Sequence, residues 1–163
     1  MESIQIIEKA KEFGACAAGI ADVEALKQSP SHLIYPQIGG YKTFLNDAVP
    51  RDSGEVSWPL LAKSALVIAV EHPENKPELD WWQDGLKGGT LGNRVLIRII
   101  SGLTEWLRKD LGCEAWGLPY YIVQGGIFLK DSAVMAGLGC IGKNNMLVTP
   151  QFGPRVRLRA ALL

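Results

Sequence analysis

The chain has 163 residues, enough for one domain, and 47% of them are hydrophobic, which is enough to form a proper core. Its 17 basic and 17 acidic residues cancel, so the composition lacks the basic excess of most nucleic-acid-binding domains, and we do not expect nucleic acid as a partner. There is no apolar run of about 18 residues and no signal-peptide pattern, which predicts a cytoplasmic protein without membrane contact. The three cysteines are far apart, which argues against a disulfide framework and supplies no metal-binding Cys-x-x-Cys pair.

The N-terminal segment predicts a helix, a strand and a second, short helix. Residues 3–13 place apolar side chains on one helical face, and Gly14 suits the helix end because glycine adopts the left-handed conformation without penalty. Residues 15–20 are small and apolar, as in a buried strand, and Cys16 within them is expected to be a buried, inert thiol. Asp22 is expected to cap the short helix that follows.

Residues 29–58 are rich in proline and glycine and predict an irregular segment. The segment carries His32, Tyr35, Tyr41 and Phe44. Such a long aromatic loop either covers a flat conjugated ligand or is a surface segment held down by its own aromatic rings. We interpret His32 as a hydrogen-bonding surface residue, because a metal site needs further ligands.

Residues 65–70 are continuously apolar and predict a central strand covered on both faces. Glu71 and His72 end it, facing either a ligand crevice or solvent. Trp81 and Trp82 follow; exposed indoles would suggest a partner or ligand contact, whereas packed indoles would cap the core.

Residues 91–111 predict the longest helix, because their apolar residues form a stripe, and Gly112 is expected to end it. Residues 114–118 predict a short strand, and 119–123 a further extended piece. A short helix is expected over residues 128–135.

Three glycines alternate with apolar residues directly after that helix, and a lysine and two asparagines follow them. A turn of this composition can expose several N–H groups together, and the lysine would add a mobile positive charge for an anion. It is neither a Walker loop nor a dinucleotide fingerprint, so a structural corner and a ligand loop both stay open. The candidate ligand-binding residues are Gly137, Leu138, Gly139, Cys140, Ile141, Gly142, Lys143, Asn144 and Asn145.

The C-terminal segment alternates arginine with apolar residues, as a strand with one charged face does. Arg155, Arg157 and Arg159 would lie on that face, where they either bind a carboxylate or phosphate or remain solvated.

Residues 136–158 resemble the block that precedes the iron–sulfur segment in epoxyqueuosine reductases, and they are similar to the corresponding block of corrinoid-dependent reductive dehalogenases. The matching sequence is Ala-Gly-Leu-Gly-Cys-Ile-Gly-Lys-Asn-Asn followed by Met-Leu-Val-Thr-Pro-Gln-Phe-Gly-Pro-Arg-Val-Arg-Leu. The resemblance implies a nitroreductase-like α/β domain, a mixed sheet flanked by helices, which binds cobalamin. It implies that the glycine block and Arg155 contact this cofactor, and that two [4Fe-4S] clusters lie in a following ferredoxin-like domain.

Two positions depart from the family pattern. Val123 stands where the family's proposed catalytic aspartate would fall, so no catalytic acid is assigned. The nearest acid, Asp131, is interpreted as a helix N-terminal charge or a surface group. Cys140 replaces the usual tryptophan; its thiol would either approach a corrin face or stay buried, and no metal ligand is assigned.

We therefore interpret residues 1–163 as a single corrinoid-binding domain, an N-terminal fragment of a longer iron–sulfur protein, because family members continue into a Cys-x-x-Cys-x-x-Cys segment that is not present here. Its expected partners are a small-molecule cofactor and a downstream ferredoxin-like domain or redox protein. The fragment alone is expected to be inactive. Two alternatives stay open: a non-catalytic corrinoid carrier or activation protein, and a flavin-binding nitroreductase-like domain.

Overall fold

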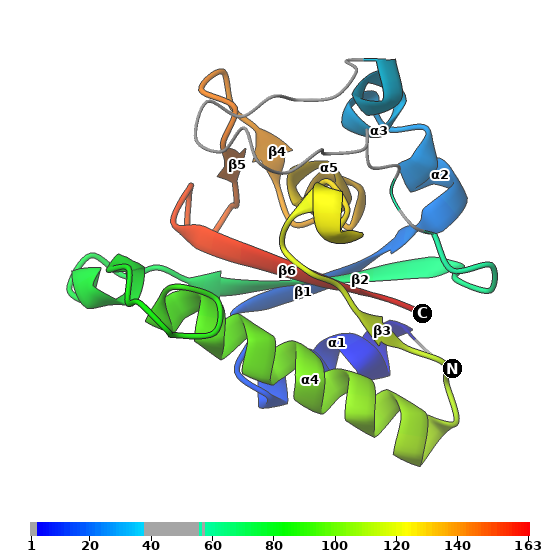
Figure 1. Ribbon diagram of the computed structural model, residues 1–163, viewed down its shortest axis with the longest axis horizontal. Coiled ribbons are helices and arrows are strands. Elements are labelled where there is room, and N and C mark those ends of the chain that lie inside the picture. The colour runs from blue at the N-terminus through cyan, green and yellow to red at the C-terminus, as the bar shows by residue number, and fades with distance from the viewer. Residues whose placement is uncertain (1–2, 38–55, 57) are drawn as a thin grey trace.

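The computed structural model describes residues 3–37, 56 and 58–163. A four-stranded sheet lies between two layers of helices (Figure 1). The strands, in the order in which they lie side by side, are β1 (Ala17–Asp22), β2 (Ser64–Glu71), β6 (Val156–Leu162) and β3 (Trp116–Gly117). The α-helices are α1 (Ser3–Glu12), α2 (Val23–Lys27), α3 (Pro30–Ile34), α4 (Leu91–Leu111) and α5 (Leu129–Met135).

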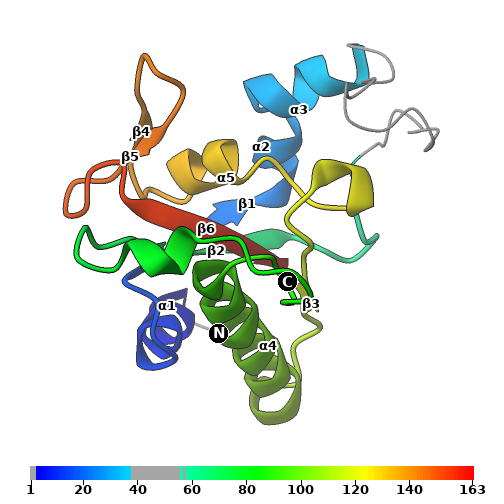
Figure 2. The same cartoon turned by 60° about the vertical axis from the view of Figure 1, so that its left-hand side comes forward.

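Strand β2 divides the core into two halves, because successive side chains of a strand point to opposite faces. Leu66 and Ile68 pack with residues of α1 and α4 on one face. Val67 and Ala69 pack with residues of α2 and α5 on the other. Figure 2 shows α1 and α4 together beneath the sheet, with α5 above it.

The expected α/β fold with helices flanking a sheet is confirmed. The resemblance implied a mixed sheet, whereas β1–β2, β2–β6 and β6–β3 are all antiparallel in the part of the chain that the structure describes. Val67, for example, lies opposite Gly19 in β1 and opposite Ala160 in β6. The buried β2 run was therefore correctly predicted as a central strand.

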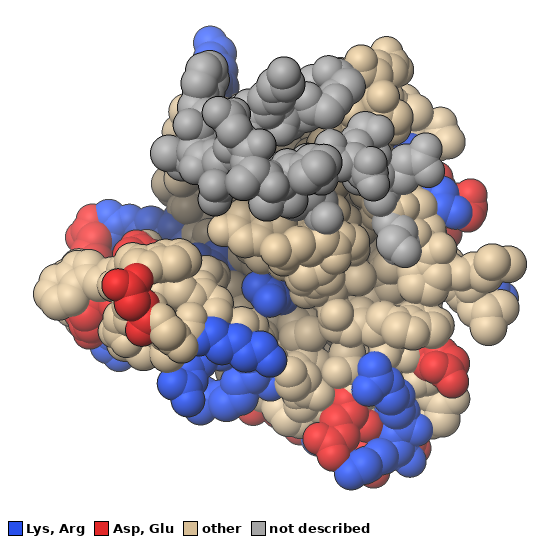
Figure 3. Space-filling view, in the orientation of Figure 1, with Lys and Arg blue, Asp and Glu red and all other residues tan. Residues whose placement is uncertain are grey.

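The helix boundaries follow the predicted capping residues. Helix α4 extends from Leu91 to Leu111 as expected, and Gly112 follows it with a φ of +60°. The Asn93 amide donates to the Thr90 hydroxyl at the helix start, at 3.2 Å. Asp22 caps α2 by accepting from the Ala25 amide at 2.8 Å. Charged groups of both signs gather over α4 (Figure 3), which agrees with the zero net charge.

Two segments differ from the expectation. The chain after β3 does not extend over 119–123; instead it forms the 3-10 turn η3 (Ile122–Gln124), which Gly125 ends at a φ of +93°. The expected irregular segment contains α3 and the turn η1 (Tyr35–Gln37), and a third such turn, η2 (Pro77–Asp80), precedes the tryptophans. Tyr41 and Phe44 lie outside the described residues.

The glycine block forms a β-hairpin beside α5. Its strands are β4 (Cys140–Ile141) and β5 (Leu147–Val148), with Cys140 opposite Val148 and Ile141 opposite Leu147. Asn145 takes a φ of +60° in the turn between them. Among the described helices, none is long and apolar enough to span a membrane.

Candidate functional site

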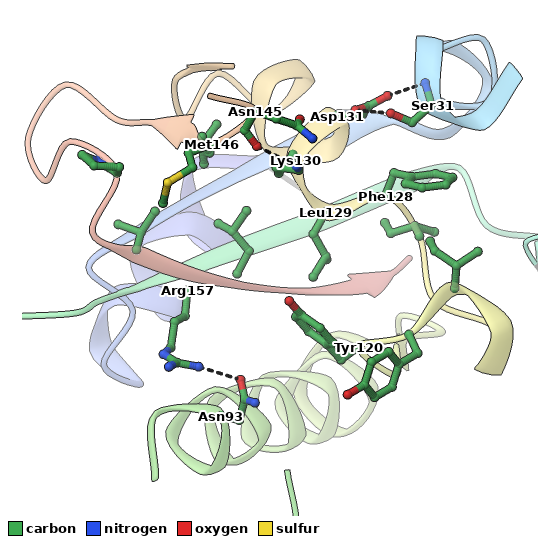
Figure 4. Close-up of a pocket in the computed structure, with 17 residues that line it drawn as sticks. Ser31, Asn93, Tyr120, Phe128, Leu129, Lys130, Asp131, Asn145, Met146 and Arg157 are labelled. Carbon is green, nitrogen blue, oxygen red and sulfur yellow. Dashed lines mark hydrogen bonds between the residues drawn. The ribbon is translucent and has the colours of Figure 1, made fainter. Parts of the chain in front are cut away.

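A cavity of about 640 Å³ lies between strand β6, the start of α5, the β4–β5 hairpin and the segment that follows β3 (Figure 4). Its wall is largely apolar. Val156 and Leu158 come from β6, Leu129 from α5, Leu147 from β5, and Ile127 from the segment before α5. Because these segments are far apart in the chain, the cavity exists only in the folded domain.

Polar groups from other segments complete the lining. The contributors are Asn93 of α4, Lys130 and Asp131 of α5, Asn145 of the hairpin turn, and Arg157 of β6. Lys130 Nζ donates to the main-chain oxygen of Asn145 at 2.7 Å and so ties α5 to the hairpin. The cavity thus combines an apolar wall with amide, ammonium, carboxylate and guanidinium groups.

Arg157 is held at the α4 side of the cavity. Its Nη1 lies 3.5 Å from both Thr90 Oγ1 and Asn93 Oδ1, and its guanidinium pairs with Asp80. Partial burial lowers the pKa of Arg157. Asp80 also contacts His72, so one carboxylate joins two basic residues.

His72 lies beside this arginine cluster rather than at a free strand end. Burial is the largest cause that lowers the pKa of His72, and the positive charges of Arg157 and Arg155 lower it further. Glu71, the other expected candidate at this strand end, is exposed. Neither residue lines the described cavity.

Asp131 is buried, with 6% of its surface exposed, so the interpretation as a surface charge was wrong. Its Oδ2 accepts from the Ser29 hydroxyl and the Ser31 amide, both at 2.9 Å, and its Oδ1 accepts from the Ser31 hydroxyl at 2.8 Å. These three bonds satisfy the buried carboxylate and join α5 to the start of α3. Ser31 and Asp131 line the upper part of the cavity in Figure 4.

His32 continues the same network and is buried, not a surface residue as expected. Its Nδ1 lies 2.7 Å from the Ser29 hydroxyl, and its Nε2 accepts from the Phe128 amide at 3.3 Å. Because the Ser29 hydroxyl donates to Asp131, it can only accept from His32, which places the imidazole proton on Nδ1. Burial lowers the pKa of His32, and the Asp131 charge partly opposes that effect.

The predicted glycine block contacts the cavity through Asn145. Leu138 is in the core instead, with 8% exposed. Cys140, Ile141, Lys143 and Asn144 are exposed on the hairpin. Their cofactor-binding role stays a prediction.

The expected cradle of free N–H groups is wrong for three of these residues. The amides donate within the hairpin corner: Gly137 to Val134 O at 3.0 Å, Leu138 to Ala133 O at 2.9 Å, and Gly142 to Met146 O at 2.8 Å. Gly139 serves a steric role, since a Cβ there would lie 2.2 Å from the Val148 oxygen. Close approach of the two hairpin strands therefore accounts for this glycine.

The three arginines of the C-terminal strand have different surroundings. Arg155 is exposed and pairs with Glu74. Arg157 lines the cavity, and Arg159 is partly buried, which lowers its pKa. Of the three, Arg157 is therefore the one that the structure brings to the cavity, whereas Arg155 was the predicted ligand.

The two tryptophans are both exposed, Trp81 at 64% and Trp82 at 69%, which is the arrangement expected of a contact surface. The described residues contain no group of three His, Cys, Asp or Glu side chains placed to hold a metal ion.

Several lining residues were not predicted, among them Asn93, Tyr121, Phe128 and Lys130. They come from α4, the segment after β3 and the start of α5, and no motif in the sequence joins these segments. The signal that was available is indirect: Lys130 and Asp131 directly precede the glycine block.

No protein-family model matches the chain. The epoxyqueuosine reductase of Gloeobacter violaceus is 28% identical over 162 residues, which cover 94% of this chain and 49% of that protein. The chain is similar to epoxyqueuosine reductase. A crystal structure of epoxyqueuosine reductase with an epoxyqueuosine-modified tRNA stem loop superimposes with a TM-score of 0.62 at 20% identity, over 98% of this chain and 44% of that one.

A reductive dehalogenase described as bearing on B12-dependent dehalogenation superimposes with a TM-score of 0.52 at 23% identity, over 94% of this chain and 18% of that one. These likenesses confirm that the fold is that of epoxyqueuosine reductases and reductive dehalogenases. The chain spans about half the length of the curated relative that it matches. Because a relative was solved with a tRNA stem loop, the neutral charge of this chain is no ground for excluding nucleic acid.

Proposed function

We propose that this chain is the cobalamin-binding domain of an iron–sulfur, cobalamin-dependent reductase similar to epoxyqueuosine reductase. The observation that carries the proposal is the cavity on β6, which combines an apolar wall with a polar lining. The likeness to epoxyqueuosine reductase and to a B12-dependent dehalogenase supports it.

The residues of the cavity fit a corrinoid. A corrin ring has an apolar face and carries carboxamide arms around its edge. Val156, Leu158 and Leu129 would contact the ring, and the amides of Asn93 and Asn145 would hydrogen-bond the arms. When bound, the cobalt would supply the bond-breaking chemistry, while this chain would hold and orient the cofactor.

The single-domain assignment and the redox partners belong to the same proposal. Electrons would come from [4Fe-4S] clusters in a downstream ferredoxin-like domain or a separate redox protein, so we expect no turnover by this chain alone. We assign no catalytic acid. Val123 lies in the turn η3, and Asp131 already accepts three hydrogen bonds that hold α3 against α5.

The test is a titration of the purified chain with hydroxocobalamin, followed by visible spectroscopy. We expect a saturable spectral change. Asn145→Gly removes the side-chain amide while tolerating the φ of +60°, and it should weaken binding by about fivefold, the effect of one hydrogen bond of about 1 kcal/mol. Lys11→Ala is the matched control, because α1 covers the opposite face of the sheet.

Two outcomes would contradict the proposal. One is the absence of any saturable spectral change at the highest soluble cobalamin concentration. The other is saturable binding of a yellow flavin in place of cobalamin, which would favour the nitroreductase-like alternative.

A further inference from the structure

The hydrogen-bond pattern of β6 determines which of its main-chain groups face the neighbouring strand. The His72 amide donates to Arg155 O at 2.8 Å, and Ser64 and Leu163 exchange bonds of 3.0 and 2.8 Å at the other end of the β2–β6 ladder. Because hydrogen-bonded pairs alternate in antiparallel sheets, the odd-numbered residues of β6 point their N–H and C=O groups toward β2. The even-numbered residues point theirs to the opposite edge.

A contact on that opposite edge confirms the alternation. The Leu118 amide, next to β3, donates to the oxygen of Ala160 at 3.0 Å. In the same register Tyr120 would lie opposite Leu158. The chain instead turns away at Pro119, whose ring fixes φ, and Tyr120 is 49% exposed at the cavity.

The edge of β6 is therefore bare over Val156 and Leu158. Their N–H and C=O groups have no main-chain partner among the described residues, and both residues line the cavity. Leu158 is 8% exposed. A main-chain group left unpaired in such a place costs about 1–3 kcal/mol unless a ligand or water satisfies it.

We infer that this open edge binds carboxamide groups of the ligand, the main chain of Val156 and Leu158 supplying donors and acceptors. A carboxamide has both N–H and C=O groups and so matches both. The inference rests on the proposed function: the ligand class is an apolar ring with carboxamide arms, and the edge specifies which of its groups are recognised.

The length of the edge favours a small molecule over a peptide strand. Two outward-facing residues are about 7 Å apart along a strand, whereas paired strands usually have 5–6 residues. Leu118 and β3 occupy the edge from Ala160 onward. A ligand with two amide groups about 7 Å apart therefore fits the free stretch, and a full strand does not.

Amide hydrogen exchange measured by NMR tests the inference. In the free chain, the Val156 and Leu158 amides should exchange faster than those of Arg157 and Arg159, which face β2 and serve as internal controls. Hydroxocobalamin should slow the first pair. Equal protection of all four amides in the free chain, or no slowing at saturation, would overturn the inference.

A single-atom replacement gives the second test. Cys140 permits ligation of a synthetic peptide of residues 140–163 to a thioester of residues 1–139, which leaves no change in sequence. Replacing the Leu158 N–H by an ester oxygen should weaken hydroxocobalamin binding about fivefold and leave the melting temperature unchanged. The same replacement at Arg159 should lower the melting temperature, because that amide faces β2.

The outcomes separate the two proposals. If the unmodified ligated chain does not bind cobalamin, both the proposed function and this ligand assignment fail. If it binds and the Leu158 ester binds equally well, the amide-binding edge is wrong while the proposed function stands.

Discussion

The Ser29 hydroxyl donates to Asp131 Oδ2 at 2.9 Å, although 102 residues separate the two in the chain. This bond joins the corner between α2 and α3 to the first turn of α5. Phe128 and Leu129, at the start of α5, line the cavity. The buried carboxylate therefore determines where one wall of the candidate site lies.

Asp131→Ala should lower the free energy of unfolding by about 3 kcal/mol, because the donors of Ser29 and Ser31 lose their acceptor inside the protein. Asp131→Asn should cost less, since one side-chain oxygen remains. Urea denaturation measures both values. Asp110→Ala, at an exposed position of α4, is the control and should change the value by less than about 0.5 kcal/mol. An equal effect of the two alanine variants would contradict the network.

Acid should destabilise the domain through His32. Burial holds the folded-state pKa of His32 below the unfolded value, so the folded state binds a proton less readily. The stabilising contribution is complete above the unfolded pKa of about 6.5 and is lost as the pH falls toward the folded pKa. Urea titrations between pH 8 and 5 should show this decline, and His32→Gln should reduce it. NMR titration of the imidazole measures the pKa itself; a value above that of a free histidine would contradict the prediction. The pKa of His72 is also lowered, so a His72→Gln chain serves as the background.

Substitutions at two neighbouring glycines should differ in cost for a steric reason. A Cβ at Gly139 would lie 2.2 Å from Val148 O, so Gly139→Ala should lower the free energy of unfolding by about 1–3 kcal/mol and displace the hairpin. At Gly137 a Cβ meets no atom within 4 Å, and the φ of +76° alone should cost about 1 kcal/mol. Lys143→Ala, exposed on the same hairpin, is the control. Similar stabilities of the two alanine variants in urea would show that the steric contact is relieved at no cost.

The cysteines should react with iodoacetamide in a fixed order. Cys140 is exposed and should be alkylated first. Cys16 is partly buried, and burial together with the nearby Glu71 charge raises its pKa, so less of the reactive thiolate is present. A time course at pH 8, read by mass spectrometry of peptides, should show Cys16 modified last. Faster modification of Cys16 than of Cys140 would contradict the assigned environments.

Local pattern was sufficient where an element buries one long face. The apolar stripe and terminal glycine of α4 predicted both ends of that helix, and the unbroken apolar run of β2 predicted a strand covered on both faces. Asp22 announced α2 because a cap acts within one turn. In each of these cases the deciding interaction lies inside a single stretch of sequence.

Interactions between distant segments were not predictable in this way. Asp131 looked like a surface charge because its donors, Ser29 and Ser31, lie about 100 residues earlier. The glycine block was correctly expected at a helix-to-strand corner, but its amides are consumed by a hairpin, which depends on pairing with Val148 and Met146. Arg157 reaches the cavity, and Arg155 does not, because of their positions along β6 relative to α4.

The order of the strands has a consequence for biosynthesis. Strand β6 lies between β2 and β3, although it follows both in the chain. During translation, β2 is complete about 90 residues before its partner leaves the ribosome, so the nascent chain carries one bare apolar strand edge. The sheet can close only after residue 162 has been made, and the high sequence separation of this pairing predicts slow folding and dependence on chaperones.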